Sequence, residues 1–266
     1  MSVKAARCWS SLQAIRRETP LIQNITNFVS MDVVANGLLA LGASPAMVHA
    51  VEEVPEFAGL ANALVVNIGT LSSAWIPSMS KAAAAMTEKK KPWVLDPVGV
   101  GATAYRTSAA RDLLAIGPTV VRANASEVLA LAGAALEPTK GVDSSHGSDQ
   151  AIDAARKLAR EAGTVVAVTG AVDYVTDGER ALHVSNGDPL MTRVTALGCA
   201  SSAVVAAFLT SESDPLAAAA EALAIFGLAA ERAAAEADGP GSLRWRLLDE
   251  LSNLDETRLR DGVKIQ

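Results

Sequence analysis

Five short apolar runs, separated by helical patterns, most constrain what this chain can fold into. The runs are rich in Val, Leu and Ile and do not alternate with polar residues, which is typical of strands buried on both faces of a parallel sheet. They cover residues 46–49, 63–68, 93–96, 119–122 and 164–169. Helical patterns cover 28–41, 73–89, 108–116, 126–131 and 149–162. Because strands and helices alternate, the pattern predicts right-handed crossovers and an α/β fold, a three-layer α/β/α sandwich.

After Gly170 the pattern changes. The stretch D-Y-V-T-D-G-E-R-A-L-H-V contains two strand-like runs joined at Asp177-Gly178, a strong hairpin signal, so we expect antiparallel strands at one edge of a mostly parallel sheet. The last third is Ala-rich and predicts helices at 198–210, 215–237 and 242–254. Since no repeat or linker divides the chain, we expect one domain over residues 1–266.

Composition excludes several function classes. The net charge is −6 and the longest basic run is Lys89-Lys90-Lys91, so a nucleic-acid partner is disfavoured. The two cysteines, Cys8 and Cys199, form no C-x-x-C pair, which disfavours a disulfide framework or a cysteine-rich zinc site. With no evident signal peptide and no apolar stretch of membrane-spanning length, we expect a cytoplasmic protein with small-molecule or protein partners and no membrane partner.

The residues that follow each strand indicate where the chemistry takes place. Ligands of open parallel sheets bind beyond the carboxyl ends of the strands. There the sequence places two carboxylates, Asp96 and Glu127, one arginine, Arg122, and several glycine-rich turns. Arginine clamps phosphate oxygens, carboxylates hold Mg²⁺, and a helix N-terminus binds anions, so this set suits a polyphosphate with a divalent ion. There is no P-loop motif, and a dinucleotide-binding glycine fingerprint is not supported.

Eight motifs in fixed order give the chain a family resemblance between about residues 20 and 208. They are P-L-I-Q-N-I-T-N-F-V-S-M-D-V-V-A-N (20–36), G-A-S-P-A-M (42–47), V-N-I-G-T-L (66–71), L-D-P-V-G-V-G-A-T (95–103), R-A-N-A-S-E (122–127), K-G-V-D-S (140–144), V-T-G-A (168–171) and G-C-A (198–200). Together they resemble hydroxyethylthiazole kinase, a family with the ribokinase-like fold. The resemblance implies ATP- and Mg²⁺-dependent phosphorylation of 4-methyl-5-(2-hydroxyethyl)thiazole, which salvages the thiazole half of thiamine. It also implies a homotrimer with active sites between subunits.

The resemblance assigns roles on the substrate side of the site. Met47 would contact the thiazole, and Asn27 and Gly69 would belong to the same pocket. Ala196 stands where the family pattern Thr-Gly-x-Gly-Cys has its first glycine. If that position needs a positive φ, alanine costs about 1 kcal/mol or more there, and the substrate contact assigned to the glycine changes.

Other roles concern the nucleotide and the transferred group. Arg122 and Thr169 would bind ATP, while Asp96 and Glu127 would serve the Mg²⁺–phosphate cluster. The N–H groups of residues 198–200 would stabilise charge on the transferring phosphoryl, so Gly198 and Cys199 are the predicted catalytic residues. Related sugar kinases carry a general-base Asp at the position of Cys199. A thiol has a reference pKa near 8.5, which a helix N-terminus can lower, and is a weaker candidate base.

Each of these residues also has a purely structural interpretation. Cys199 and Met47 would be packing residues, and Asp96 would begin a turn. Arg122 would pair with a surface carboxylate. Glu127 fits the third helical position after an Asn124 cap, where its side chain would bond back to the cap.

Three other functions stay open at this level. They are a hydroxymethylpyrimidine kinase, a nucleotide-dependent hydro-lyase of the same fold, and a nucleotide-binding regulator without activity. The N-I-T-N-F and N-I-G-T-L motifs disfavour the first, and Cys199 in place of an aspartate disfavours the second. The set of Arg122, Asp96 and Glu127 argues against the third.

Overall fold

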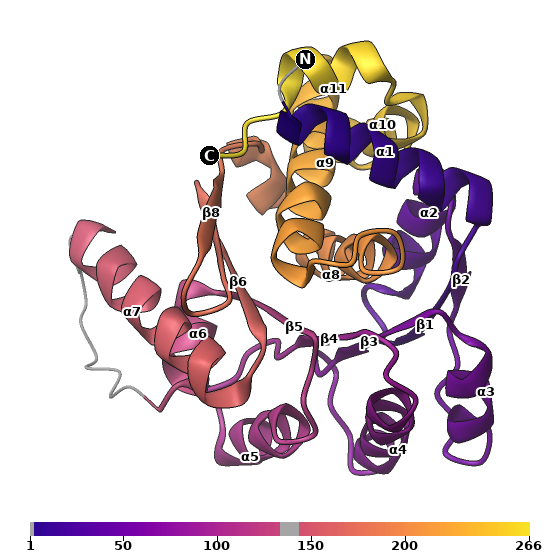
Figure 1. Cartoon of the computed structure of the whole chain (residues 1–266), viewed down its shortest axis with the longest axis vertical. Helices are drawn as coiled ribbons and strands as arrows, with labels where there is room; N and C mark the ends of the chain where they lie inside the picture. Colours follow the sequence, from indigo (N-terminus) through magenta and orange to yellow (C-terminus); the bar gives the residue numbers. More distant parts are fainter. Residues whose placement is uncertain (1–2, 134–143) are drawn as a thin grey trace.

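The main feature of the fold is one eight-stranded sheet between two layers of helices (Figure 1). A computed structural model describes residues 3–133 and 144–266, without the side chains of 144–148. The strand order is β2-β1-β3-β4-β5-β6-β7-β8; β1 to β6 are parallel and β7 and β8 antiparallel. The strands are β1 Leu21–Ile25, β2 Ser44–Ala46, β3 Ala63–Asn67, β4 Trp93–Asp96, β5 Val120–Asn124, β6 Val165–Thr169, β7 Asp173–Thr176 and β8 Ala181–Val184.

Two hydrophobic cores cover the two faces of the sheet. Alternate residues of β3 belong to different cores: Val65 packs with one helix layer, and Leu64 and Val66 pack with the other. One layer contains α1 Val3–Glu18, α2 Met31–Leu41, α8 Leu197–Phe208, α9 Pro215–Ala235, α10 Pro240–Asn253 and α11 Glu256–Gly262. The other contains α3 Val54–Leu60, α4 Trp75–Glu88, α5 Ala104–Leu114, α6 Ala125–Leu131 and α7 Ser144–Ala162. The predicted three-layer α/β/α sandwich is confirmed.

The edge of the sheet at β8 is occupied by the last residues of the chain. Ile265 forms a bridge with Val184, and His183 exchanges two backbone hydrogen bonds with Gln266, of 3.1 and 2.9 Å. Ser185 N–H donates to the carbonyl of Lys264 at 3.0 Å. The predicted hairpin at Asp177-Gly178 is confirmed by the antiparallel pairing of β7 and β8, and Gly178 has a φ of 98°.

The prediction was wrong about where the sheet begins. The first run was placed at 46–49, but β2 ends at Ala46, and the chain enters the sheet earlier through β1. Gln23 and Asn24 interrupt the apolar pattern of β1, although both are fully buried. Helices α1 and α3 were also not predicted, and α5 begins four residues early because the Thr103 side chain caps it by accepting the N–H of Arg106.

Residues 140–143 of the K-G-V-D-S motif lie outside the described residues. In the described ranges, none of the helices is both long enough and apolar enough to cross a bilayer.

Candidate active site

The candidate site lies where the carboxyl ends of the parallel strands meet the N-terminus of α8. Register brings the tips together: Asn67 at the end of β3 pairs with Asp96 at the end of β4, and Asn124 of β5 pairs with Thr169 of β6. Within α8, Ala200 N–H bonds to the carbonyl of Ala196 at 3.0 Å, so the N–H groups before it have no partner within the helix.

Asp96 is the centre of a buried polar network. Its side chain is 0 % exposed. Oδ2 accepts hydrogen bonds from Asn67 Nδ2 at 2.6 Å and from Ser202 Oγ at 2.9 Å. Oδ1 has no hydrogen-bond partner among the described residues and lies 4.0 Å from Nη1 of Arg122. The carboxylate therefore keeps one buried oxygen without a hydrogen bond beside a cation, and Asp96 takes part in this network as well as beginning the turn before Val98.

Burial dominates the protonation of Asp96. It raises the pKa of the carboxyl, and Glu127 raises it further, while Arg122 and the hydrogen bonds from Ser202 and Asn67 act in the opposite direction. Arg122 and the two donors are therefore the groups that favour a charged Asp96.

Asn27 joins this network to the start of α2. Its Nδ2 donates to Asn67 Oδ1 at 2.9 Å and lies 3.3 Å from the sulfur of Cys199. Its Oδ1 accepts the N–H groups of Val29 and Ser30, both at 3.1 Å. Gly69 packs against this side chain: a Cβ on Gly69 would lie 2.5–2.7 Å from atoms of Asn27. The structure thus brings together Asn27, Gly69 and Cys199.

The thiol of Cys199 is held protonated by its surroundings. Burial and the neighbouring Asp96 raise its pKa above the ordinary value, although the hydrogen bond from Asn27 acts in the opposite direction. The helix N-terminus does not outweigh burial here. The thiol is therefore neutral at pH 7.

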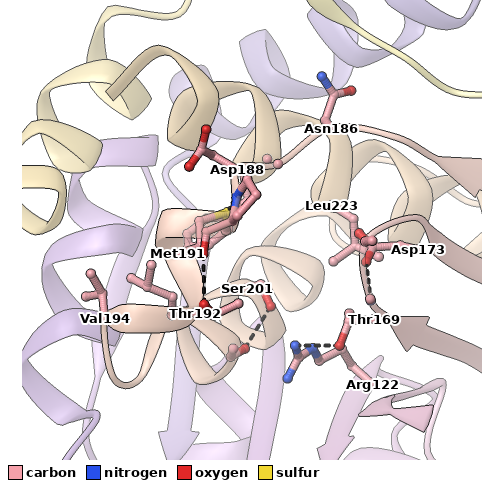
Figure 2. A pocket seen from close by; sticks show the side chains of 18 of the residues that line it. Arg122, Thr169, Asp173, Asn186, Asp188, Met191, Thr192, Val194, Ser201 and Leu223 are labelled. Carbon is pink, nitrogen blue, oxygen red and sulfur yellow. Dashed lines mark hydrogen bonds between the residues drawn. The ribbon is translucent and has the colours of Figure 1, made fainter. Parts of the chain in front are cut away.

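Arg122 connects the network to a cavity. Nη2 donates to Thr169 Oγ1 at 2.8 Å (Figure 2), whereas Nε has no partner among the described residues. A Cβ on Gly198 would lie 2.7 Å from Nη1, so the glycine lets the guanidinium lie against the first turn of α8. The nearest carboxylate partner of Arg122 is the buried Asp96, which contradicts the surface-pair interpretation.

The cavity has a volume of about 620 Å³, within the range of small-molecule sites. Its walls come from the tip of β6, the segment 186–194, the start of α8 and one face of α9 (Figure 2). Arg122, Thr169, Ala196 and Gly198 line one part of it. Leu223, Phe226 and Gly227 form an apolar part of the wall. The cavity thus combines a cationic wall with an apolar one.

Two acidic residues of the cavity wall, Asp173 and Asp188, were not predicted. Asp173 is 9 % exposed, and its Oδ1 accepts the N–H of Gly170 at 2.9 Å, which closes the turn between β6 and β7. Burial raises the pKa of Asp173 to about 6, against the opposing effects of that hydrogen bond and of Arg122. The signal was in the sequence: an acidic residue follows T-G-A-V directly after a strand tip.

Glu127 caps α6, as its sequence position also allowed. Oε2 accepts the N–H of Asn124 at 2.9 Å, Asn124 Oδ1 accepts the N–H of Glu127 at 3.0 Å, and Oε1 accepts the N–H of Gly99 at 2.8 Å. Among the described residues there is no group of three or more His, Cys, Asp or Glu that could hold a metal ion. Mg²⁺ usually needs only one or two carboxylates plus substrate phosphates, so the unpartnered Oδ1 of Asp96 fits such an ion.

Ala196 and Met47 differ in where the structure places them. Ala196 lines the cavity and has a φ of 69° and ψ of 1°, so its position does require the left-handed conformation. Met47 follows β2 and packs, partly buried, against the core of α2 and α8; it is not among the described residues that line the cavity. Its contact with substrate stays a prediction.

The chain resembles proteins of one family in sequence and in fold. The sequence model of the hydroxyethylthiazole kinase family matches residues 12–257. A hydroxyethylthiazole kinase of Zea mays is 54% identical over 263 residues, covering 97% of this chain and 92% of its own. A solved structure of a hydroxyethylthiazole kinase protein from Pyrococcus horikoshii has a TM-score of 0.91 at 45% identity, covering 98% of both chains. A ribokinase-like superfamily protein from Enterococcus faecalis, 13% identical with a TM-score of 0.61 over 87% of this chain and 86% of its own, shows the shared fold.

Proposed function

Because the chain belongs to the hydroxyethylthiazole kinase family, we propose that it transfers the terminal phosphoryl group of ATP to the hydroxyl of 4-methyl-5-(2-hydroxyethyl)thiazole. In this proposal residues 1–266 act as one catalytic domain in thiamine salvage. The observation that carries it is the meeting of a nucleotide-sized cavity and a closed polar network at Arg122 and Gly198.

ATP is the co-substrate expected of a kinase, and the cavity of about 620 Å³ is its proposed site. Leu223, Phe226 and Gly227 would receive the base on the apolar part of the wall. Arg122, held by Thr169, would clamp phosphate oxygens with the donors that it does not use within the protein. The free N–H groups at the start of α8 would stabilise the charge that develops on the transferring group.

The thiazole would bind beside the buried network. Asn27, Gly69 and Cys199 meet there, with Met47 and Ala196 as the further proposed contacts. The attacking hydroxyl would lie beside Cys199, whose protonated thiol is a poor base. Phosphoryl transfer through a loose transition state needs positioning more than early removal of the proton, so this arrangement suffices.

Mg²⁺ is the proposed metal. Asp96 would serve it through the unpartnered Oδ1, and Glu127, at the adjacent helix start, would be the second carboxylate. The ion would supply positive charge that neutralises the phosphates. The Arg122 guanidinium, 4.0 Å from Oδ1, favours the charged form of Asp96 against the effect of burial, which raises the pKa of the carboxyl.

We extend the proposal to a homotrimer with active sites between subunits. Phe28 and Val29 follow Asn27 directly and are 67% and 58% exposed, and the ring of Phe28 packs against Trp75 in a tilted arrangement with 4.7 Å between ring centroids. This apolar rim of the site would be covered by a neighbouring subunit. Light scattering tests it: a mass of about one chain, 27.4 kDa, would overturn the trimer.

A coupled assay of ADP release tests the activity. The enzyme is incubated with ATP and hydroxyethylthiazole, hydroxymethylpyrimidine or a sugar, with Mg²⁺ or with a chelator. We expect ADP release that needs both the thiazole and Mg²⁺. Release with the pyrimidine alone would favour the pyrimidine kinase, and no thiazole-dependent release would overturn the proposal.

A further inference from the structure

Arg106 holds two loops of the site together, although it belongs to no group assigned above. It lies in the first turn of α5, and its guanidinium donates to three backbone carbonyls. Nη1 donates to Ile68 and, at 2.8 Å, to Val98; Nη2 donates to Gly69 at 2.9 Å. Ile68 and Gly69 follow β3, whereas Val98 follows β4. One cation therefore joins the main chains of two neighbouring strand tips.

The glycine-rich turn D-P-V-G-V-G-A-T is shaped around this side chain. Gly99 has a φ of +71°, and a Cβ on it would lie 3.3 Å from Cδ of Arg106. Thr103 caps α5 by accepting the N–H of Arg106 at 3.2 Å, and Thr107 Oγ1 accepts the N–H of Gly101 at 3.0 Å. A turn of this composition suggests a close approach of main chain to a phosphate, but here the approach is made to an arginine.

Both loops contact groups of the candidate site through their main chain. Gly69 N–H donates to Asn67 Oδ1 at 2.9 Å, and Asn67 in turn donates to Asp96 at 2.6 Å. On the other loop, Gly99 N–H donates to Glu127 Oε1 at 2.8 Å. A change in the separation of the two loops would therefore move Gly69, which is proposed to contact the thiazole, and the carboxylates Asp96 and Glu127, which are proposed to serve the metal.

We propose that Arg106 is a positioning residue that sets the spacing between the loop after β3, which it contacts at Ile68 and Gly69, and the loop after β4, which it contacts at Val98. This inference rests on the proposed function. Arginine suits the task because its planar fork has five N–H donors at fixed angles, whereas lysine has one nitrogen and cannot reach three separated carbonyls with the same geometry. The nucleotide cavity is not lined by Arg106, so the effect is confined to one half of the site.

The test uses Arg106→Met, Arg106→Lys and Arg106→Ala in the full chain. Arg111→Met is the control, because Arg111 is exposed on the same helix. Steady-state kinetics give kcat and the KM of the thiazole, and equilibrium titration gives the affinity for ATP. We expect Arg106→Met to lower kcat by about 10²-fold, the size of effect that a misplacement of about 1 Å produces, with ATP affinity within about twofold of the parent. Arg106→Lys should lie between Met and the parent, and Arg111→Met should match the parent.

Chemical rescue keeps the test decisive if a variant folds poorly. Methylguanidinium added to Arg106→Ala should restore part of kcat, whereas methylammonium should not. The inference is overturned if Arg106→Met keeps full kcat, if kcat and ATP affinity fall together, or if the two cations rescue equally. A parent enzyme without thiazole-dependent ADP release overturns the proposed function itself, and the inference falls with it.

Discussion

The two halves of the site are built in opposite ways. At the start of α8 a buried polar network links side chains by hydrogen bonds. Its members are Asp96, Asn67, Asn27 and, from α8 itself, Ser202. On the other side of Arg122 lies an open cavity of about 620 Å³, whose wall includes Gly170, Gly187, Gly198 and Gly227. In the first half side chains fix one another. In the second half side chains such as Arg122, Leu223 and Phe226 line a space that is large enough for a small molecule.

The buried network holds its polar groups in fixed positions, whereas the cavity provides space for a ligand. Changes in the network should reduce the rate of the chemical step, because they move groups that act in the transition state. Changes in the cavity should affect nucleotide binding first. Arg122 belongs to both halves, so the comparison is best tested at residues on either side of it.

Asp96→Asn should have the largest effect. The substitution keeps the size of the side chain but removes the carboxyl group that would serve the metal, so we expect kcat to fall by about 10²–10³-fold, as for the loss of one preorganised electrostatic group. Steady-state kinetics at saturating ATP measure it. Asp112→Asn, on the exposed face of α5, is the control. A variant with near-parental kcat would show that the network is structural only.

Gly198→Ala should come second and act on binding. The new Cβ would lie 2.7 Å from Nη1 of Arg122 and displace the guanidinium. We expect the KM of ATP to rise by about tenfold, the equivalent of one weakened charge-assisted hydrogen bond, with a smaller change in kcat. Gly241→Ala is the matched control, because a Cβ there meets nothing within 4 Å. An unchanged KM would contradict the role given to the glycine.

Cys199→Ala should cost less than tenfold in kcat, well below the roughly 10²–10⁴-fold expected for removal of a general base. The reason is that burial and Asp96 raise the pKa of the thiol and keep it protonated. Cys199→Asp, which introduces the carboxylate of related kinases, should remain active. Near-complete loss of activity in a folded Cys199→Ala protein with normal substrate binding would instead identify an obligatory base.

Asp173→Asn should change the pH dependence by a few-fold. Because burial raises the pKa of Asp173 to about 6, the group stabilises the fold fully below its unfolded pKa of about 3.9, and this contribution is lost as the pH rises through 6. Above pH 6 the cavity wall carries a negative charge that opposes phosphate. At pH 7.5 the variant should therefore have the lower KM for ATP and the higher Tm, and at pH 5 both differences should shrink. Equal differences at both pH values would refute this.

Ala196→Gly should have the smallest effect. The left-handed conformation, with a φ of 69°, costs an alanine about 1 kcal/mol, but glycine loses more entropy on folding by about 0.5–1 kcal/mol. We expect the free energy of unfolding to change by at most about 0.5 kcal/mol, measured by urea denaturation, whereas Ala196→Val should lower it clearly. A clear loss of stability in Ala196→Gly would show that the alanine methyl packs favourably.

The sequence predicted the helix and sheet layers of the fold better than it predicted the buried polar network around Asp96. Apolar runs and the Asp177-Gly178 turn are local signals, and they correctly indicated the parallel strands and the hairpin. Strand β1 was missed because Gln23 and Asn24 look solvent-exposed in a pattern but are buried in the fold. Local periodicity does not show which polar residues tertiary packing will enclose.

The hydrogen-bond partners of the predicted site residues could not be predicted from the sequence for a similar reason. Ser202 bonds to Asp96 from 106 positions away, and Asn67 from 29 positions away. Motif order placed Asp96, Arg122 and Gly198 at strand tips and a helix start, but only the fold shows which atoms remain unpaired. The role of Gly198 is an example: the motif identifies the glycine, and the guanidinium that would occupy the space of its Cβ explains it.

The segment 264–266, which pairs with the outer side of β8, has a consequence for how copies of the protein meet. Its hydrogen bonds to His183 and Ser185 occupy main-chain groups that would otherwise form an open edge. An unprotected edge is a template for pairing with another chain and hence for aggregation. Residues 264–266 therefore cover this edge of the sheet. We expect a chain without them to pair with other copies along β8, while the candidate site at the strand tips keeps its structure.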